Sequence, residues 1–175
     1  ALGAERAGRR VPGLDFERSQ RGARDANEDE DGQILRAAAE HLAASLRAAA
    51  VAADLDALRG VEGEAAKTYF EAMPALVRRD VRPAFAMNGR SRRPPRDSFN
   101  ALISFLYSML MNDCRSALEA VGLDPQLGFL HAVRPGRAAL ALDLMEEFRA
   151  IVADRLALTL VNRGQISEKD FHERE

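Results

Sequence analysis

Residues 98–121 read SFNALISFLYSMLMNDCRSALEAV, and this stretch decides the fold class. Its apolar side chains recur every three or four residues, at Phe99, Leu102, Leu106 and Leu110. That spacing marks one face of an α-helix rather than the alternation of a β-strand. Asp97 or Ser98 is suited to cap the start of the helix, and Gly122 is suited to end it. The stretch therefore predicts an amphipathic helix that fills residues 98–121.

Three further segments show helical spacing of apolar residues, namely 33–53, 55–73 and 138–161. Turns are predicted between helices at Asp124-Pro125 and Pro135-Gly136. Alternating patterns of useful length and internal repeats are both absent, and the chain has no tryptophan. Alanine, leucine, arginine and glutamate, which favour helices, dominate the composition. We therefore expect an all-α fold.

The composition limits the classes of protein to which the chain can belong. With 175 residues and 47% hydrophobic side chains, it can bury one substantial core. Cys114 is the single cysteine, so an intrachain disulfide is excluded and a reducing compartment fits. Apolar runs stay well short of the ~20 residues that cross a bilayer. These observations predict a soluble, cytoplasmic protein with one folded domain.

The two ends of the sequence differ from its middle. Residues 1–32 contain a group of arginines followed by a group of acids, with little hydrophobic periodicity. We expect them to form a poorly packed lead-in or inter-domain linker, and residues 33–175 to form the helical domain. The sequence stops at Glu175 in a charged segment. We therefore expect it to be a fragment of a longer protein.

Residues 131–149, HAVRPGRAALALDLMEEFR, place a histidine before a Pro-Gly turn and a helix. His131 follows a strand-like apolar run, and the helix carries Asp143 and Glu146 three residues apart. Side chains at that separation share a helical face. An imidazole and carboxylates that face an open space suit a divalent metal ion. A histidine such as His131, taken alone, is more often a hydrogen-bonded residue of the core than a metal ligand.

A second carboxylate stands in an unexpected place. Glu62 falls on the apolar stripe of the predicted helix 55–73, where burial of an unpaired charge would cost several kcal/mol. Gly60 and Gly63 flank it, which would suit close approach by a backbone or a ligand. Glu62 is therefore a candidate third metal ligand. The alternative is a salt bridge to an arginine, such as Arg59 or Arg137.

The third feature is the loop NGRSRRPPRD, residues 88–97. It contains four arginines within seven positions, at Arg90, Arg92, Arg93 and Arg96. Two consecutive prolines hold the segment extended. Guanidinium groups bind phosphate oxygens in a bidentate manner, so the loop is a candidate phosphate-binding element. A solvated basic loop that balances acids elsewhere is the alternative interpretation.

Several ordered stretches of the sequence resemble one known family. They are LRGVEGEAAKTYF (58–70), NGRSRRPPRDSFNALISFLYSML (88–110), LDPQLGFLH (123–131), RPGRAALALDLMEEFR (134–149) and VNRGQISEKDF (161–171). These stretches resemble Cas-one, the CRISPR-associated integrase of the spacer-adaptation module. The combination of RRPPRD, NAL and GFLH is most similar to the lineage of type I-C systems.

The resemblance implies a function in antiviral defence. It implies a helical, metal-dependent DNA endonuclease and integrase that inserts foreign DNA spacers into a CRISPR array. The partners implied are DNA (the protospacer and the CRISPR repeat), a second copy in a homodimer of the full-length protein, and the Cas-two adaptation subunit. In the full-length protein a β-rich dimerisation domain would precede the helical domain, and we expect this N-terminal β domain to be absent here or reduced to the lead-in.

The resemblance also implies roles for individual residues. The family's EG glutamate falls on Glu62, its GF-x-H histidine on His131, and its acid pair on Asp143 and Glu146. All four are expected to be catalytic, and Glu62, His131 and Glu146 are expected to bind the metal. Glu147 competes with Glu146 by position, but the family spacing of three favours Glu146.

Further family positions fall on residues expected to support the site. Arg134 and Arg149 are expected to contact DNA phosphate, together with the arginines of the loop. Asn100 and Tyr107 are expected to be supporting residues. Ala150 stands where the family often has proline, a departure expected to change only the local helix geometry.

The expected cofactor is Mg²⁺ or Mn²⁺, since a mainly oxygen site with one imidazole suits both ions. His131 is a candidate either for a metal ligand or for a proton carrier. Two rival functions remain, a metal-independent helical protein-interaction module and a metal-dependent hydrolase of small molecules. The second of these leaves the arginine loop without a role.

Overall fold

The computed structural model describes residues 28–172. The helices in this range are α2 (Glu28–Ala50), α3 (Leu55–Ala72), η1 (Met73–Leu76), α4 (Ser98–Ala120), α5 (Ala139–Phe148), η2 (Arg149–Asp154), α6 (Arg155–Asn162) and η3 (Glu168–Asp170). η1 and η3 are 3₁₀-helices, and η2 is a π-helical segment. Residues 28–172 contain no β-strand, so the predicted all-α fold is confirmed.

The first helix starts earlier than the periodicity predicts. α2 begins at Glu28 rather than at residue 33, so the predicted boundary at residue 32 falls inside its first turns. Four acids occupy this start, where the positive end of the helix dipole stabilises negative charge. Residues 1–27, which make up most of the predicted lead-in, lie outside the described residues.

The long central helix α4 forms as its sequence predicts. The Asp97 carboxylate accepts a hydrogen bond from the backbone N–H of Asn100, which caps the helix. At the other end Gly122 adopts φ +79°, and the N–H of Leu123 donates to the carbonyl of Leu118. This is the usual glycine-terminated end of a helix. Both predicted caps of the helix are confirmed.

The predicted helix 138–161 is continuous, but its middle part is not α-helical. It consists of α5, the π-helical segment η2 and α6, which follow one another without a break. Within η2 the N–H of Arg155 donates to the carbonyl of Ala150, five residues earlier. Such an insertion rotates the helix that follows it, and π-helical turns are frequent at functional sites. Ala150, the departure from the family pattern, lies inside this segment.

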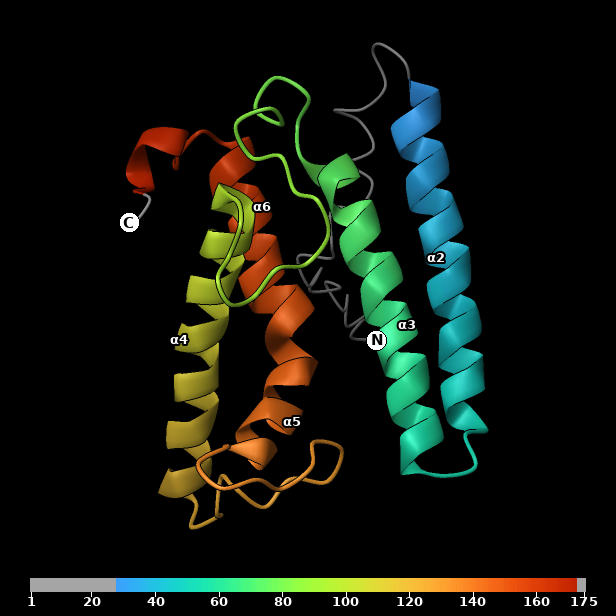
Figure 1. Cartoon of the computed structure of the whole chain (residues 1–175), viewed down its shortest axis with the longest axis vertical. Helices are drawn as coiled ribbons and strands as arrows, with labels where there is room; N and C mark the ends of the chain where they lie inside the picture. The colour runs from blue at the N-terminus through green and yellow to red at the C-terminus, as the bar shows by residue number, and fades with distance from the viewer. Residues whose placement is uncertain (1–27, 173–175) are drawn as a thin grey trace, which may run out of the picture.

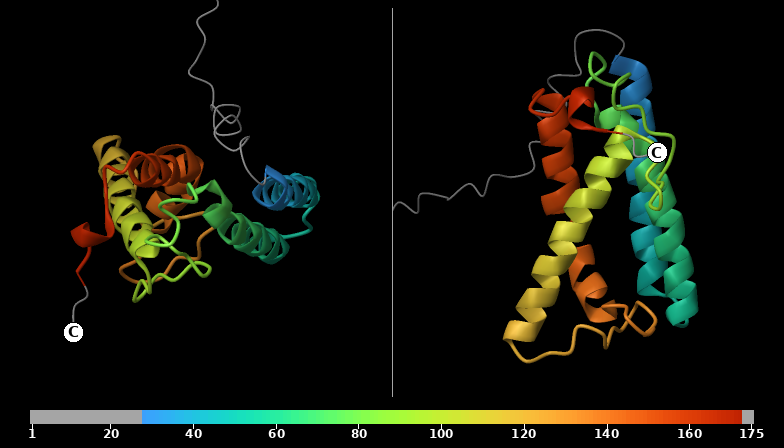
Figure 2. Two further views of the ribbon diagram at one scale, coloured as in Figure 1. Left: turned by 90° about the horizontal axis from the view of Figure 1, so that it is seen from above. Right: turned by 60° about the vertical axis from the view of Figure 1, so that its left-hand side comes forward.

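The helices form two groups (Figures 1 and 2). α2 and α3 make an antiparallel hairpin on one side, and α4 lies beside the α5–η2–α6 helix on the other. The main core joins the groups near η1, through residues such as Phe70, Met73, Phe99, Ile103 and Val161. A smaller cluster of Cys114, Leu118, Ala141 and Met145 packs α4 against α5 alone, at the opposite end.

An ion pair strengthens the junction near η1. Asp31 of α2 accepts hydrogen bonds from both terminal nitrogens of Arg82, at 3.0 and 3.1 Å. The Arg82 hydrogen bond is the largest effect on the pKa of Asp31, which lies below its ordinary value despite some opposition from burial.

No helix within residues 28–172 has the length and apolar character needed to cross a membrane.

Candidate active site

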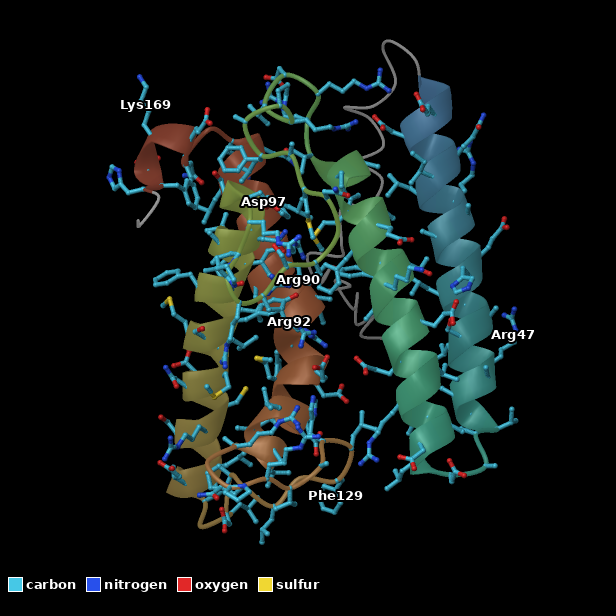
Figure 3. The ribbon with its side chains drawn as sticks, viewed as in Figure 1. Arg47, Arg90, Arg92, Asp97, Phe129 and Lys169 are labelled. Atoms are coloured by element: carbon cyan, nitrogen blue, oxygen red, sulfur yellow. The ribbon has the colours of Figure 1, made fainter. Side chains whose placement is uncertain are left out.

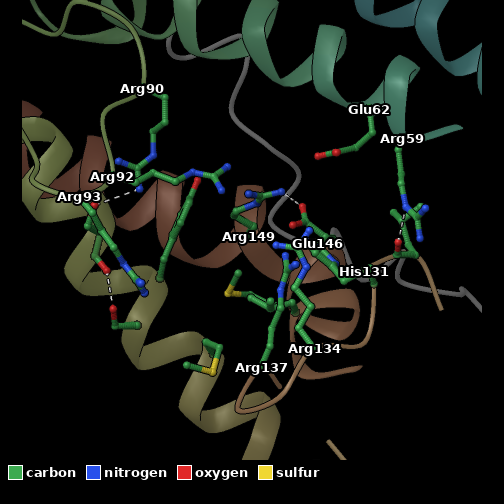
Figure 4. A pocket seen from close by; sticks show the side chains of 18 residues that line it. Arg59, Glu62, Arg90, Arg92, Arg93, His131, Arg134, Arg137, Glu146 and Arg149 are labelled. Carbon is green, nitrogen blue, oxygen red and sulfur yellow. Dashed lines mark hydrogen bonds and ion pairs between the residues drawn. The ribbon is translucent and has the colours of Figure 1, made fainter. Parts of the chain in front are cut away.

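A pocket of about 650 Å³ lies between α3, α4 and α5, beside the main core (Figure 4). Three predicted metal ligands, Glu62, His131 and Glu146, line it. Tyr107 and seven arginines share the lining: the predicted DNA contacts Arg90, Arg92, Arg93, Arg134 and Arg149, with Arg59 and Arg137 as additional cations. The fold thus gathers most of the predicted site around one space.

His131 is oriented by Asp143. The Nδ1 atom of His131 lies 2.7 Å from Oδ1 of Asp143, and the backbone N–H of His131 donates to the same oxygen at 2.9 Å. A carboxylate at this position favours the tautomer with the proton on Nδ1. Nε2 is then the ring nitrogen that is available to the pocket. This is how a second carboxylate orients a histidine that binds a metal or carries a proton.

Asp143 itself does not line the pocket, so the expectation that it faces an open space beside Glu146 was wrong. Its other oxygen accepts backbone N–H groups from Phe129 and Leu130. Burial opposes ionisation, but the hydrogen bonds from His131, Phe129 and Leu130 together hold the pKa of Asp143 below its ordinary value. The carboxylate is therefore committed to holding the loop before α5.

Gly128 allows that loop to approach α5. A Cβ atom built on Gly128 would lie 2.7 Å from both the carbonyl carbon and the Cβ of Ala139, and 2.9 Å from Oδ2 of Asp143. Such distances are far inside van der Waals contact. The apolar run that precedes His131 was expected to be strand-like, but it forms an irregular, bent loop in which Phe129 is 80% exposed.

Glu62 occupies the predicted place for a different reason. It is exposed at the pocket and not buried on an apolar stripe, so the burial argument was wrong. Within residues 28–172 it has no hydrogen bond or ion pair, and Arg59 instead contacts Asp56 and the carbonyl of Leu130. A Cβ atom on Gly60 or Gly63 would meet nothing within 4 Å, so close approach by another part of the described chain does not explain these glycines.

Glu146 extends from α5 and forms an ion pair with Arg149, one turn later. The Arg149 guanidinium lies over the ring of Tyr107, with its central carbon 5.4 Å from the ring centroid. Glu147 is exposed and does not line the pocket. The geometry therefore favours Glu146 over Glu147 as the pocket carboxylate.

The donor set has the chemistry that a hard divalent ion requires. Two carboxylates and one imidazole fit Mg²⁺ or Mn²⁺, and Mn²⁺ tolerates the nitrogen better. Within residues 28–172, however, no three acidic, histidine or cysteine side chains lie close enough to hold one ion together. Glu62 comes from α3 and Glu146 from α5, on different sides of the pocket (Figure 4).

The arginine loop divides into an inner and an outer part. The Arg90 guanidinium is held by Asn100, Ser104 and the carbonyl of Ser91, and desolvation by burial lowers its pKa. Figure 3 shows Arg90 and Arg92 near the centre of the molecule. Arg92 and Arg93 line the pocket as well, whereas Arg96 does not. The predicted phosphate-binding element therefore faces the carboxylates with three of its four arginines.

Asn100 supports this loop from below. Its side chain is fully buried, and its amide oxygen accepts from Arg90 and from the backbone N–H of Ser91. Its amide nitrogen donates to the carbonyl of Gly89 and to Asp97. The predicted supporting role of Asn100 thus has a concrete form, because one side chain fixes the loop to the start of α4.

Asp154 was missed by the sequence interpretation. It is buried, with 2% exposed, and accepts hydrogen bonds from Tyr107 at 2.6 Å and Tyr69 at 2.9 Å. Burial raises its pKa above the ordinary range, although both phenol hydrogen bonds oppose that shift. An acid surrounded by Ala153, Ala157 and other core positions of the last helix was the available signal.

A family comparison identifies the chain. Residues 16–175 match the model described as "CRISPR associated protein Cas1". The chain belongs to the Cas1 family. The resemblance seen in the sequence is therefore confirmed, and it extends over most of the chain.

Curated relatives agree with this assignment. A CRISPR-associated endonuclease Cas1 from Moorella thermoacetica is 57% identical over 154 residues, which cover 88% of this chain and 45% of that relative. The corresponding protein from Chlorobaculum tepidum is 52% identical, over 86% of this chain and 44% of that relative. The chain thus spans a little less than half the length of these two relatives.

Solved structures share its helical fold. A CAS1 protein from Thermotoga maritima superposes with a TM-score of 0.71 at 32% identity, covering 91% of this chain and 52% of that protein. A casposase bound to its integration product gives 0.68 at 25% identity, covering 91% and 51%. A partial Cas6-RT-Cas1–Cas2 complex gives 0.74 at 27% identity, covering 90% of this chain and 46% of that chain.

Proposed function

We propose that this chain is the helical catalytic domain of a metal-dependent DNA endonuclease and integrase that inserts spacers into a CRISPR array. The observation that carries the proposal is the pocket in which Glu62, His131 and Glu146 share a lining with seven arginines. Oxygen and imidazole ligands suit the metal, and guanidinium groups suit phosphate. The relatives named as endonucleases and the casposase with its integration product support the same reaction class.

In this proposal Glu62, His131 and Glu146 would hold Mg²⁺ or Mn²⁺. When bound, the ion would polarise a phosphoryl oxygen and stabilise the developing charge. Asp143 keeps Nε2 of His131 available to the pocket, for a metal or for a proton. The arginines of the lining orient the phosphodiester, so that a DNA 3′-hydroxyl or a water molecule can approach from the opposite side.

Arg149 has two roles in the proposal, since it contacts DNA phosphate and also pairs with Glu146. Its ion pair neutralises Glu146 while no cation is bound. Because a divalent ion would compete for the same carboxylate, the guanidinium of Arg149 would then be available to phosphate. Metal and DNA binding are therefore expected to favour one another.

The partners proposed are protospacer and repeat DNA, the Cas2 subunit (Cas-two above) and a second copy of the full-length protein. One solved neighbour is a Cas1–Cas2 complex, which supports the Cas2 subunit as a partner, and the casposase bound to its integration product supports DNA. The homodimer rests on family resemblance alone. Localisation in the cytoplasm stays a prediction.

The test is a nicking and strand-transfer assay on branched DNA with Mn²⁺. Because the chain spans less than half of its curated relatives, the assay uses the chain joined to the N-terminal part of the Moorella thermoacetica relative. Glu62→Gln, His131→Asn and Glu146→Gln are each expected to abolish activity. Glu64→Gln and Glu147→Gln, which remove exposed acids close to these positions, are expected to keep it.

Thermal unfolding of the chain alone distinguishes the proposed function from its rival, the metal-independent interaction module. A Mn²⁺-dependent rise in the melting temperature that is lost in Glu62→Gln supports the proposed site, since ligand binding to the native state stabilises it. Full strand-transfer activity of Glu62→Gln would instead remove the site from consideration. Absence of any metal effect on both stability and activity would favour the metal-independent interaction module.

A further inference from the structure

Asp154 has no part in the proposed reaction, yet it is the one charged side chain that is buried within residues 28–172. It lies in η2, and its two oxygens receive hydroxyl groups from different helices, Tyr69 of α3 and Tyr107 of α4. Burial of a carboxylate is costly even with partners. The position of the Asp154 carboxylate at the junction of three elements, despite this cost, suggests that it has a specific role.

The position of Tyr107 indicates that use. Its ring lies under two guanidinium groups of the pocket, since the central carbons of Arg90 and Arg149 are each 5.4 Å from the ring centroid. Cations at this distance from an aromatic face are attracted to it. Within the described part of the chain, Tyr69 carries no comparable cation. The hydrogen bond from Tyr107 to Asp154 therefore fixes a platform on which pocket arginines rest.

The π-helical segment explains why Arg149 and Asp154 meet at the same ring. In an α-helix, with about 100° between successive residues, side chains five positions apart point to different sides. A π-helical turn, with its i→i+5 hydrogen bonds, contains more residues than an α-helical turn, so residues i and i+5 lie closer to the same side. Arg149 and Asp154 are the first and last residues of η2 and are separated by five positions. The insertion thus brings the pocket cation and the buried acid to one side.

We infer that Asp154 is a positioning residue, which acts through Tyr107 to hold the guanidinium of Arg149, and of Arg90 beside it, for binding of DNA phosphate. This inference rests on the proposed function, because it takes DNA phosphate as the ligand. It assigns Asp154 no contact with DNA or with a metal ion.

The sign of one substitution separates positioning from simple electrostatics. Asp154→Asn removes a negative charge from beneath a cationic pocket, so electrostatics alone predicts tighter binding of an anion. Positioning predicts weaker binding, because the charge-assisted hydrogen bond that anchors Tyr107 becomes a weaker, neutral one. Affinity of this chain for branched duplex DNA, measured by fluorescence anisotropy at several salt concentrations, is expected to fall. The slope of log K against log salt is expected to flatten by roughly 0.9, the value for one bound phosphate.

Two tyrosine variants provide a matched pair. Tyr107→Phe and Tyr69→Phe each remove one hydrogen bond to Asp154, so both are expected to lower the melting temperature. Only Tyr107→Phe is expected to weaken DNA binding, because Tyr107, unlike Tyr69, has arginines over its ring. If Asp154→Asn does not fold, this pair decides the question. Equal DNA affinity of the two variants, or wild-type or tighter affinity of a folded Asp154→Asn, overturns the inference.

A DNA-free measurement separates this inference from the proposed function. Ring currents of Tyr107 should displace the Nε–Hε nuclear magnetic resonance signal of Arg149, which is assigned with Arg149→Lys. The displacement is expected to shrink in Asp154→Asn and to persist in Tyr69→Phe. If neither the chain nor its fusion with the N-terminal part of the Moorella thermoacetica relative binds DNA, the proposed function fails and this measurement alone tests the positioning. An unchanged Arg149 signal in Asp154→Asn overturns the inference.

Discussion

At the scale of single residues, the site depends on the close approach of Gly128 to Ala139 of α5. The loop that carries His131 can approach α5 only because residue 128 lacks a side chain. The approach places three backbone N–H groups within reach of Asp143. The orientation of the histidine thus depends on Gly128 as much as on the carboxylate that it contacts.

Gly128→Ala is therefore expected to destabilise the fold by about 1–3 kcal/mol, the usual cost of overpacking. The new methyl group would meet the backbone of Ala139, which cannot move as a flexible side chain would. Urea unfolding measures the effect. Gly60→Ala is the matched control, since nothing lies within 4 Å of its added methyl group. That control should gain roughly 0.4–1 kcal/mol, as expected for an unstrained helical glycine. Equal stabilities of the two variants would contradict this account.

Asp143 gives the molecule a defined response to acid. Its pKa is depressed in the folded state, so its contribution to stability is complete above the unfolded value of about 4 and is lost as pH falls through the folded value. The free energy of unfolding of Asp143→Asn should consequently fall less than that of wild type between pH 5 and pH 3. Urea titrations at both values measure it, with Asp113→Asn as a control at an exposed acid. Parallel acid losses in wild type and Asp143→Asn would exclude this role.

At the scale of elements, local signals were reliable and tertiary ones were not. The caps of α4 could be predicted because a capping carboxylate and a glycine with positive φ act within a few residues. The π-helical segment could not be predicted, because its residues have ordinary helical preferences and its contacts with Tyr69 and Tyr107 come from other helices. Glu62 was placed at the pocket by resemblance, although the burial argument for it was wrong.

The arginine loop is expected to contribute affinity without sequence preference. Substitution of its four arginines by glutamine should weaken binding to every duplex alike and flatten the salt dependence of log K by roughly 0.9 for each phosphate that is no longer bound. Because Arg96 does not line the pocket, Arg96→Gln alone should change the slope least, and Arg92→Gln should change it more. Anisotropy titrations at several salt concentrations measure both. An unchanged slope in the fourfold variant would identify the loop as a solvated surface.

At the scale of the whole molecule, the chain holds the proposed ligands but only part of the length of its relatives. We expect circular dichroism to show a mostly helical domain with a cooperative melt, since its helices share one main core. We expect weak Mn²⁺ binding and little strand transfer by the chain alone, even with Cas2 added. DNA affinity grows with the number of phosphates contacted together, and a shorter protein offers fewer. Efficient integration by residues 1–175 alone would show that the helical domain is self-sufficient.

The two apolar clusters lie at opposite ends of α4, and the smaller of them contains Cys114, the sole cysteine of the chain. Burial of this thiol, which also raises its pKa, makes it unreactive while α4 and α5 stay together. The rate at which a thiol reagent labels Cys114 therefore measures how often these two helices separate. It does so independently of the main core, which contains no thiol. Because Cys114 is native, separation of α4 and α5, which both contribute to the pocket, can be followed without introducing a cysteine.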